Sequence, residues 1–370
     1  MTVHLETPAA TGGREHPEQP APAIGDRFAA PGALRFDPGA GEDWPDRVLA
    51  RLAADQTAWC VAPFRDDAPV TWIGTAATAT EAPGPALRPQ HHRLRFDPDP
   101  GRYADTVRRA GVAIAAGTLK KVVLGRWATV HTDPPLSADQ LTRRLRQLHP
   151  DATVFSVPLA EGAGAPVLLG ASPELLISRR GRSIASTPLA GTVPRHPDPV
   201  LDRAAGDQLL ASAKNRAEHD FVVRHIVERL RPLCSRLQVP EPRLLATDTV
   251  WHLATPITGR LRGDHEPASV LHLARLLHPT PAIAGVPTEA ALRLIGELED
   301  ADRGPFTGFV GWMDADGDGE VAVTIRAGVL DGDALRLYAG AGIVAGSDAD
   351  AEVAETAAKL DTVLTAAGVR

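Results

Sequence analysis

The sequence predicts an α+β protein whose sheets are largely antiparallel. Runs of β-branched and aromatic residues, such as "KVVLGRWATV" at 121 to 130, are typical of buried strands. Segments with apolar residues at helical spacing lie between these runs, and turn residues join several neighbouring strands as hairpins. This combination favours mixed α and β structure over an all-parallel sheet.

The bulk composition is that of an ordinary globular protein. The chain has 370 residues, of which 44% are hydrophobic and 23% charged, so fibrous and disordered classes are excluded. The formal net charge of −7 gives no general attraction for nucleic acid or an anionic membrane surface, so an anionic ligand needs a local cluster of positive groups. Cys60 and Cys234 are too few for a disulfide framework, and the sequence carries neither a signal peptide nor a long apolar span. We therefore expect a cytoplasmic protein with a small-molecule pocket.

The N-terminal third is expected to begin with a tail. Residues 1–25 are rich in Pro, Gly, Ala and Glu without an apolar period, which predicts a mobile segment before a single domain over 26–370. A helix is expected over 45 to 56 and strands over 59 to 64 and 69 to 76, followed by a Pro-rich link over 83 to 100.

The remaining two thirds alternate between helices and strands. Tyr103, Val107, Ala110 and Ile114 recur at helical spacing before the strand at 121 to 130, and Ser137 with Gln140 forms a capping box. Further strands are expected over 152 to 159, 166 to 180, 182 to 192, 249 to 261, 306 to 313, 320 to 330 and 334 to 344. Further helices are expected over 199 to 234, 268 to 277, 287 to 299 and, capped by Ser347, 348 to 366.

Two ionisable residues in apolar surroundings are candidates for acid and base chemistry. Glu174 follows a Ser-Pro break inside "LLGASPELL", and Lys121 opens the strand "KVVLGR". Glu174 can be a turn residue with its carboxylate in water, or a desolvated carboxyl group whose raised pKa suits a general acid. Lys121 can be a solvated strand edge, or a buried base within a pocket.

Carboxylates on two predicted helices are candidates for a metal site. Glu218 in "AKNRAEHD" either complements the helix dipole or serves as a ligand for a hard cation such as Mg²⁺. Glu352, Glu355 and Lys359 in "AEVAETAAKL" share one helix face, where Glu355 and Lys359 also fit an ordinary surface ion pair. "DADGDGEVAVTI" is predicted to be a hairpin turn, since its twelfth residue is Ile325 where a calcium loop needs Glu.

Taken together, ten words in this sequence resemble the chorismate-utilising enzymes, and specifically the isochorismate synthases of the catecholate siderophore branch. The words are "KVVLGR", "LLGASPELL", "STPLAGT", "LLASAKNRAEHD", "VWHLATPITG", "LLHPTPAIAG", "VGWMDADGDGE", "TIRAG", "LYAGAGIV" and "AETAAKL". They follow the family's order and nearly its spacing, most strongly over 101–366. The resemblance implies an anthranilate synthase component I-like fold, with a large core of two antiparallel sheets and helices outside.

The resemblance also implies residue roles. Lys121 matches the general base that activates water for attack on C2 of chorismate, and Glu174 matches the acid that protonates the departing C4 hydroxyl. Glu218 and Glu355 match the Mg²⁺ carboxylates, with Glu352 close by. The implied substrate contacts are Arg326 for the enolpyruvyl carboxylate, the backbone of Gly340, Ala341 and Gly342, and the pocket positions Gly191, His278, Ala282, Ile283 and Lys359.

Within the family, the nucleophile and the later steps decide the product. The lysine at 121 favours water over ammonia, and the word "HPTPA" at 278 to 282 favours release of isochorismate by an isomerase. A salicylate synthase, which goes on to eliminate pyruvate, and a non-catalytic chorismate-binding relative stay open as alternatives. We expect a monomer without nucleic-acid or membrane partners.

Overall fold

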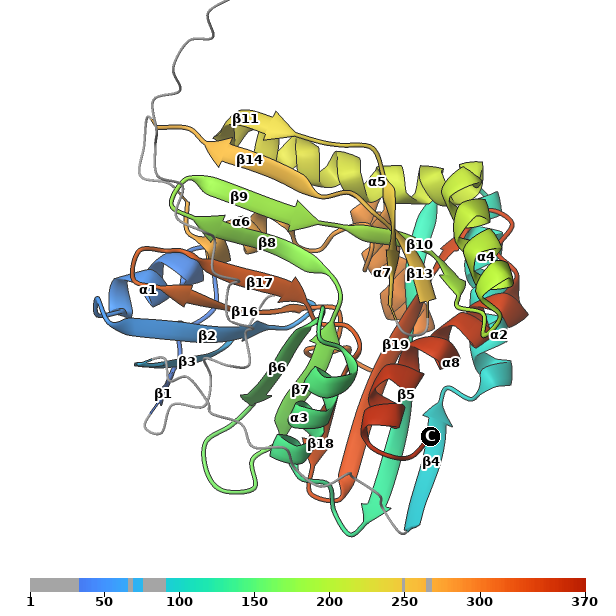
Figure 1. Ribbon diagram of the computed structural model, residues 1–370, viewed down its shortest axis with the longest axis horizontal. Helices are drawn as coiled ribbons and strands as arrows, with labels where there is room; N and C mark the ends of the chain where they lie inside the picture. The colour runs from blue at the N-terminus through green and yellow to red at the C-terminus, as the bar shows by residue number, and fades with distance from the viewer. Residues whose placement is uncertain (1–32, 66–68, 76–90, 248–249, 264–267) are drawn as a thin grey trace, which may run out of the picture.

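In the computed structural model, residues 33–65, 69–75, 91–247, 250–263 and 268–370 are described. The predicted tail over 1–25 and residues 83–90 of the Pro-rich link lie outside these ranges, whereas the rest of the link contains a strand, His91–Asp97, that was not predicted. Within them the strands form antiparallel sheets of nine, seven and three strands, which run side by side across the molecule (Figure 1). The expected α+β architecture is confirmed, and the three-stranded sheet is an addition to the two sheets that were predicted.

The nine-stranded sheet carries the N-terminal strands at one edge. Its order is β1 Leu34–Phe36, β3 Val70–Thr75, β2 Gln56–Ala62, β16 Phe309–Asp314, β17 Gly319–Val323, β8 Leu175–Arg180, β9 Ser183–Thr187, β14 Ile257–Leu261 and β11 Cys234–Gln238. The hairpin predicted around "DADGDGE" joins β16 to β17 and is confirmed.

The seven-stranded sheet is built around the long pair β5 and β19. Its order is β15 Gly285–Val286, β5 Lys121–Asp133, β19 Ala334–Val344, β18 Ala327–Asp331, β7 Val167–Ser172 and β6 Thr153–Pro158, with β4 His91–Asp97 also paired to β5. The three-stranded sheet has the order β10 Leu189–Pro194, β13 Val250–Ala254 and β12 Arg243–Ala246.

Four segments that were predicted as single strands change sheet instead: three of them do so at a proline, and the 320 to 330 segment does so between Val323 and Ala327 without one. The 166 to 180 segment leaves the seven-stranded sheet at Ser172 and enters the nine-stranded sheet at Leu175, with Pro173 and Glu174 between them. Pro188 and Pro256 make comparable breaks in the 182 to 192 and 249 to 261 segments. A proline has no N–H for the ladder, so pairing stops there and the chain turns to a neighbouring sheet.

Helices cover these sheets from several sides (Figure 1). They are α1 Trp44–Arg51, α2 Pro100–Ala115, α3 Ala138–Leu148, α4 Pro199–Ala211, α5 Ala213–Leu230, α6 Val270–Leu277, α7 Thr288–Leu298 and α8 Ala349–Ala366, with a 3₁₀ turn at Arg231–Leu233. The helix expected over 199 to 234 divides at Ser212, whose side chain accepts a hydrogen bond from the Asn215 N–H and starts α5. Asp348, and not Ser347, caps α8.

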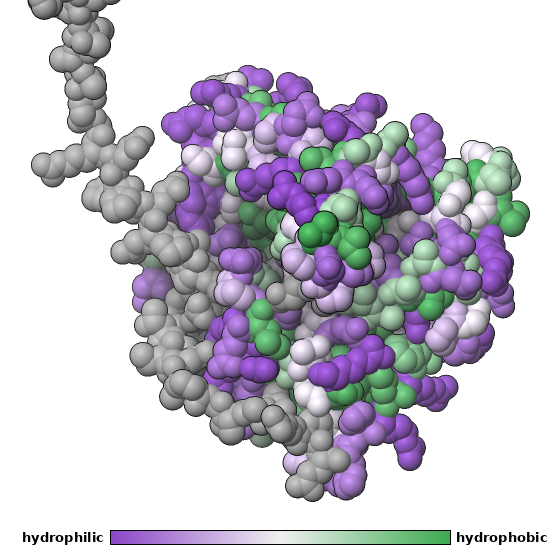
Figure 2. Space-filling view, turned by 45° about the vertical axis from the view of Figure 1, so that its right-hand side comes forward, coloured by the Kyte–Doolittle hydropathy of each residue, from purple (hydrophilic) through white to green (hydrophobic). Residues whose placement is uncertain are grey.

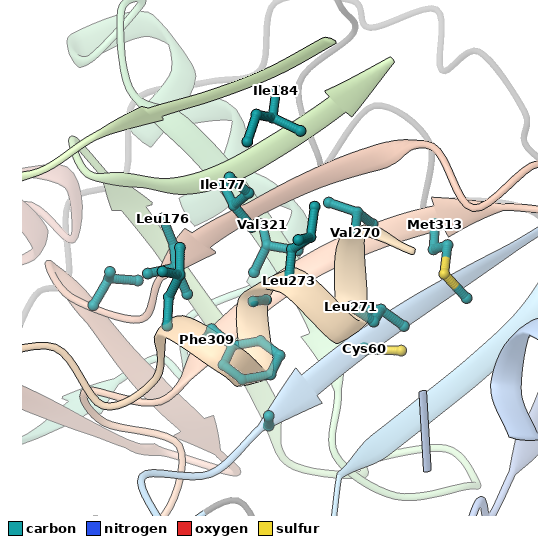
Figure 3. Packing of buried hydrophobic residues seen from close by; sticks show 14 of the residues in the cluster. Cys60, Leu176, Ile177, Ile184, Val270, Leu271, Leu273, Phe309, Met313 and Val321 are labelled. Carbon is teal, nitrogen blue, oxygen red and sulfur yellow. The ribbon is translucent and has the colours of Figure 1, made fainter. Parts of the chain in front are cut away.

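Apolar burial fixes the helices on the sheets. Figure 3 shows Val270, Leu271 and Leu273 of α6 lying against the nine-stranded sheet beside Ile177 and Val321. A second cluster packs α3 and the end of α8 on the seven-stranded sheet, and a third packs α2 and α7 against β5 and β19. Truncation of a buried leucine in such a cluster typically costs about 2–5 kcal/mol, so α5 and α8 are presented from a rigid frame.

The helix surfaces that face away from the sheets are mostly polar. Figure 2 shows the side of the molecule that carries α2, α4 and α8, where hydrophilic residues predominate and apolar residues form small groups. No helix among the described residues is long and apolar enough to span a membrane.

Candidate active site

One cavity of about 270 Å³ collects most of the predicted site residues. It lies where β5 and β19 face the strand crossovers and the first turns of α5 and α8. The predicted residues that line it are Lys121, Glu174, Gly191, Glu218, Ala282, Ile283, Arg326, Gly340, Gly342, Glu352, Glu355 and Lys359. Segments more than 200 residues apart in sequence therefore supply one set of charged groups.

Glu174 is buried at the crossover between β7 and β8. Its backbone is held by Ser172, whose Oγ accepts from the Glu174 N–H, and by Val323, whose N–H donates to the Glu174 carbonyl. Burial raises the pKa of the Glu174 carboxyl to about 7, against the opposing effects of the Leu189 N–H and of Lys121. A carboxyl group with this pKa still carries a proton near neutral pH, so it can act as an acid.

Lys121 lies at the start of β5, fully buried, and pairs with Glu218 of α5. The Lys121 Nζ is 2.8 Å from the Glu218 Oε1. Gly342 on β19 permits this pairing, since a Cβ there would lie 2.6 Å from the Glu218 Oε1 and 3.0 Å from the Lys121 Cε. A side chain at 342 would displace one partner of the ion pair.

A second lysine pairs with the carboxylates of α8. The Lys359 Nζ lies 2.5 Å from the Glu355 Oε1 and donates to the Gly340 carbonyl at 2.8 Å. Burial, and then the charge of Glu355, raise the pKa of the Glu352 carboxyl to about 7. Glu352 and Glu355 thus lie together in the cavity wall, and Lys359 is in direct contact with Glu355.

The carboxylates of α5 and α8 have the donor chemistry that Mg²⁺ prefers. Mg²⁺ takes oxygen ligands, keeps several waters and uses only one or two protein carboxylates. The described part of the chain contains no ready-made group of three metal-binding side chains. Glu218 and Glu355 instead hold lysines, so a cation would have to replace Lys121 and Lys359 as their partner.

Arg326 lies at the crossover from β17 to β18, where its φ of 51° is uncommon for a residue other than glycine. Burial lowers the pKa of this guanidinium to about 10. It meets His252 on β13, with the Arg326 Nη2 3.2 Å from the His252 Nε2, while the His252 Nδ1 is 3.0 Å from the Thr192 Oγ1. No carboxylate of the described residues forms an ion pair with Arg326, so its other donors can receive an anion.

His252 and Thr192 are site residues that the sequence analysis did not select. Burial and the charge of Arg326 hold the pKa of His252 well below its usual range, so the ring is neutral and accepts at Nε2 from Arg326. Both residues lie within motifs quoted above, "VWHLATPITG" and "STPLAGT". The available signal was a polar residue close to a proline that interrupts a predicted strand.

Two glycines of β19 direct backbone donors to the cavity. On the neighbouring β5, the N–H groups of Val123 and Gly125 donate away from β19. In an antiparallel ladder, the residues opposite them, Gly342 and Gly340, then also direct their N–H and C=O groups away from β5. The bond from Lys359 to the Gly340 carbonyl fits this geometry. These N–H groups form a second place for a carboxylate.

His278 and the side chain of Ala341 do not line the cavity. The His278 Nε2 donates to the Phe64 carbonyl at 2.8 Å, its ring packs edge-on against Phe64 and Phe309, and burial lowers its pKa to about 4. Ala341 packs into the apolar cluster beside α2 and α7. The structure therefore places His278 outside the lining of this cavity, with its Nε2 proton bonded within the protein.

The family model described as "Chorismate binding enzyme" matches residues 72–368. The isochorismate synthase DhbC of Bacillus subtilis is 45% identical over 282 residues, which cover 75% of this chain and 70% of that protein.

Solved structures agree with this similarity. A protein of Bacillus anthracis assigned as a 2,3-dihydroxybenzoate-specific isochorismate synthase, DhbC, is 36% identical with a TM-score of 0.83, over 93% of this chain and 92% of that one. Anthranilate synthase component I of Streptococcus pneumoniae, at 20% identity, has a TM-score of 0.73 over 96% and 95% of the two chains, and it bears on the fold alone.

Proposed function

This chain belongs to the chorismate-binding enzyme family, and we propose that within it the chain is an isochorismate synthase, an isomerase that converts chorismate to isochorismate. The observation that carries the proposal is one cavity in which a buried carboxyl group that keeps its proton near neutral pH, Glu174, shares the walls with Lys121 and Arg326. Similarity to the isochorismate synthase of B. subtilis supports the same activity.

Glu174 and Lys121 divide the proton transfers. Water attacks C2 of the ring and gives a proton to the Lys121 amine, the ring double bonds shift, and the C4 hydroxyl leaves as water with the proton of Glu174. One hydroxyl enters and one leaves, so the reaction is an isomerisation without a redox partner. Raised carboxyl pKa values are the usual property of such general acids.

The ion pair of Lys121 must open before this lysine can serve as the base. An ammonium group holds no lone pair, and in the structure the Lys121 Nζ is bonded to Glu218. When the Glu218 carboxylate takes another cationic partner, the lysine becomes available for the nucleophilic water. The pair therefore connects occupation of the carboxylate site with readiness of the base.

We assign Mg²⁺ to Glu218 and Glu355, with Glu352 beside them. These residues line one cavity, and burial, followed by the negative charge of Glu355, raises the pKa of Glu352; a cation would offset the second of these effects. Bound there, the ion would supply Lewis acidity to an anionic substrate. The chain itself supplies the orientation, since α5 and α8 carry these carboxylates on a packed frame.

Arg326 and the β19 glycines hold the other end of the substrate. Chorismate is a dianion, and a protein with a net charge of −7 must hold it with local positive groups. The guanidinium of Arg326 and the N–H groups of Gly340 and Gly342 are assigned to the enolpyruvyl carboxylate, with Lys359 close to the metal side. Ala282 and Ile283 form the apolar wall, which excludes competing water.

The siderophore branch is supported by the likeness to the 2,3-dihydroxybenzoate-specific protein of B. anthracis. A cytoplasmic location and a monomeric state stay predictions. A salicylate synthase activity stays the alternative product assignment.

Product analysis tests the function. The purified protein is incubated with chorismate and Mg²⁺, without ammonia, and the products are identified by chromatography and mass. We expect isochorismate in equilibrium with chorismate, and none after addition of EDTA. Salicylate with pyruvate would favour the alternative enzyme, and lack of any conversion would favour a non-catalytic chorismate-binding protein.

A further inference from the structure

Arg126 is a buried arginine directly beneath α8. It lies on β5, five residues after Lys121, and only 1% of it is exposed. The Arg126 Nη1 is 3.2 Å from the Thr356 Oγ1 and 3.5 Å from the Val353 carbonyl. The Phe96 ring lies 4.6 Å from its guanidinium carbon. Its contacts are therefore made to one helix and to aromatic faces.

No carboxylate of the described residues lies within ion-pair distance of Arg126. Its Nε has no hydrogen-bond partner, and burial lowers the pKa of the guanidinium. Two other buried arginines differ: Arg303 pairs with Glu299 at 2.5 Å, and Arg179 with Asp318 at 3.4 Å. Arg326, which faces the cavity, shares with Arg126 the lack of an ion pair among the described residues. An unpaired buried charge costs stability, so the fold keeps Arg126 for something other than a local ion pair.

The two α8 contacts of Arg126 alternate with the cavity carboxylates. Val353 directly follows Glu352, and Thr356 directly follows Glu355. A step of one residue turns a helix by about 100°. Arg126 therefore binds one face of this part of α8, and the neighbouring face presents Glu352 and Glu355 to the cavity. The two hydrogen bonds of Arg126 therefore hold the turn of α8 from which Glu352 and Glu355 project.

We propose that Arg126 is a positioning residue, which holds the first turns of α8 so that Glu352 and Glu355 present their oxygens to a divalent cation in the cavity. The inference rests on the metal assignment made under the proposed function. Tyr103 packs on the same guanidinium, with its ring centre 5.7 Å from the Arg126 Cζ. Arg126 touches neither substrate nor cation, and acts through the helix.

Magnesium affinity, measured by calorimetry without substrate, tests the proposal. Arg126→Met keeps the volume and loses the charge and both contacts. We expect its Kd for Mg²⁺ to rise about ten- to a hundredfold, the effect of one hydrogen bond to a charged group. We expect kcat at saturating Mg²⁺ to stay within about threefold, with a raised KM for chorismate, and Arg126→Lys to recover part of the affinity.

Arg179→Met is the matched control, because it removes a buried arginine far from α8 that bonds the Gly181 and Asp316 carbonyls. It should lower stability and leave the Kd for Mg²⁺ unchanged. Loss of stability in Arg126→Met with wild-type Mg²⁺ affinity would overturn the proposal.

Two further readouts keep the test decisive. If Arg126→Met does not fold, Thr356→Val removes one contact and leaves the charge, and about a threefold rise in the Kd for Mg²⁺ is expected; an unchanged Kd overturns the proposal. If the wild-type protein binds no Mg²⁺, the metal assignment fails, and the positioning role fails with it. The wild-type titration alone thus separates the two failures.

Discussion

Replacement of Glu174 by glutamine should make the protein more stable at alkaline pH while removing catalysis. The pKa of the Glu174 carboxyl rises from 4.5 in the unfolded chain to about 7 in the buried site. An acid with a raised folded pKa contributes stability below its unfolded pKa, and that contribution is lost as pH rises towards 7. At about 1.36 kcal/mol per unit, the wild-type protein loses about 3 kcal/mol between pH 4.5 and 8.5 through this group.

Glutamine has the same shape and cannot ionise, and its amide oxygen can still accept from the Leu189 N–H. We therefore expect the variant and the wild type to differ little at pH 4.5, and the variant to be about 3 kcal/mol more stable at pH 8.5. Urea unfolding at the two pH values measures the difference, and subtraction removes the other titrating groups. The burial argument would be refuted if the difference in free energy of unfolding between variant and wild type were equal at both pH values, or if the wild type became the more stable of the two as pH rises.

Other predictions concern the remaining walls of the site. Glu355→Gln should weaken Mg²⁺ binding in calorimetry at least tenfold and raise the Mg²⁺ concentration needed for half-maximal turnover to a similar extent, whereas unchanged binding would remove this residue from the metal site. Lys121→Met should lower kcat at least a hundredfold with chorismate binding kept within a few fold, as equilibrium titration can check. Gly342→Ala should lower kcat/KM strongly, because the added Cβ meets the Glu218 Oε1 at 2.6 Å; wild-type kinetics would contradict the close approach. His278→Gln should leave the KM for chorismate unchanged. Because the pKa of His278 is lowered to about 4, the wild-type protein loses stability as pH falls below 6.5. The variant lacks this loss and should unfold at a lower pH in an acid titration.

The sequence predicted the element types well, because most strands carry dense β-branched runs and most helices carry an apolar stripe. It predicted the sheet assignment poorly. The segments at 166 to 180 and 249 to 261 each read as one strand, since the apolar pattern continues on both sides of the break. Proline was visible at both breaks, yet a proline alone does not state which sheet the chain enters next.

For the site, the family words brought together residues that no local pattern connects. Glu174 had an alternative as a solvated turn residue, and its burial decides against that. Glu355 had an alternative as an i,i+4 ion pair with Lys359, and the structure contains this pair at the cavity wall, partly shielded from solvent. His278 was misplaced, since a sequence word does not state whether a ring faces the cavity or lies behind its wall. His252 was missed, because its importance comes from contact with Arg326, which lies 74 residues away in the sequence.

Glu174 and Arg326 both lie where a strand has left one sheet and has not yet joined the next. The Glu174 carbonyl accepts from the Val323 N–H, and the Arg326 carbonyl accepts from the Ala171 N–H, so each residue is bonded across the junction of the two sheets. A slight rotation of the nine-stranded sheet against the seven-stranded one should therefore shift the acid and the guanidinium together. Directed evolution towards a different product should therefore yield substitutions between the sheets, well away from the substrate, as readily as in the cavity wall.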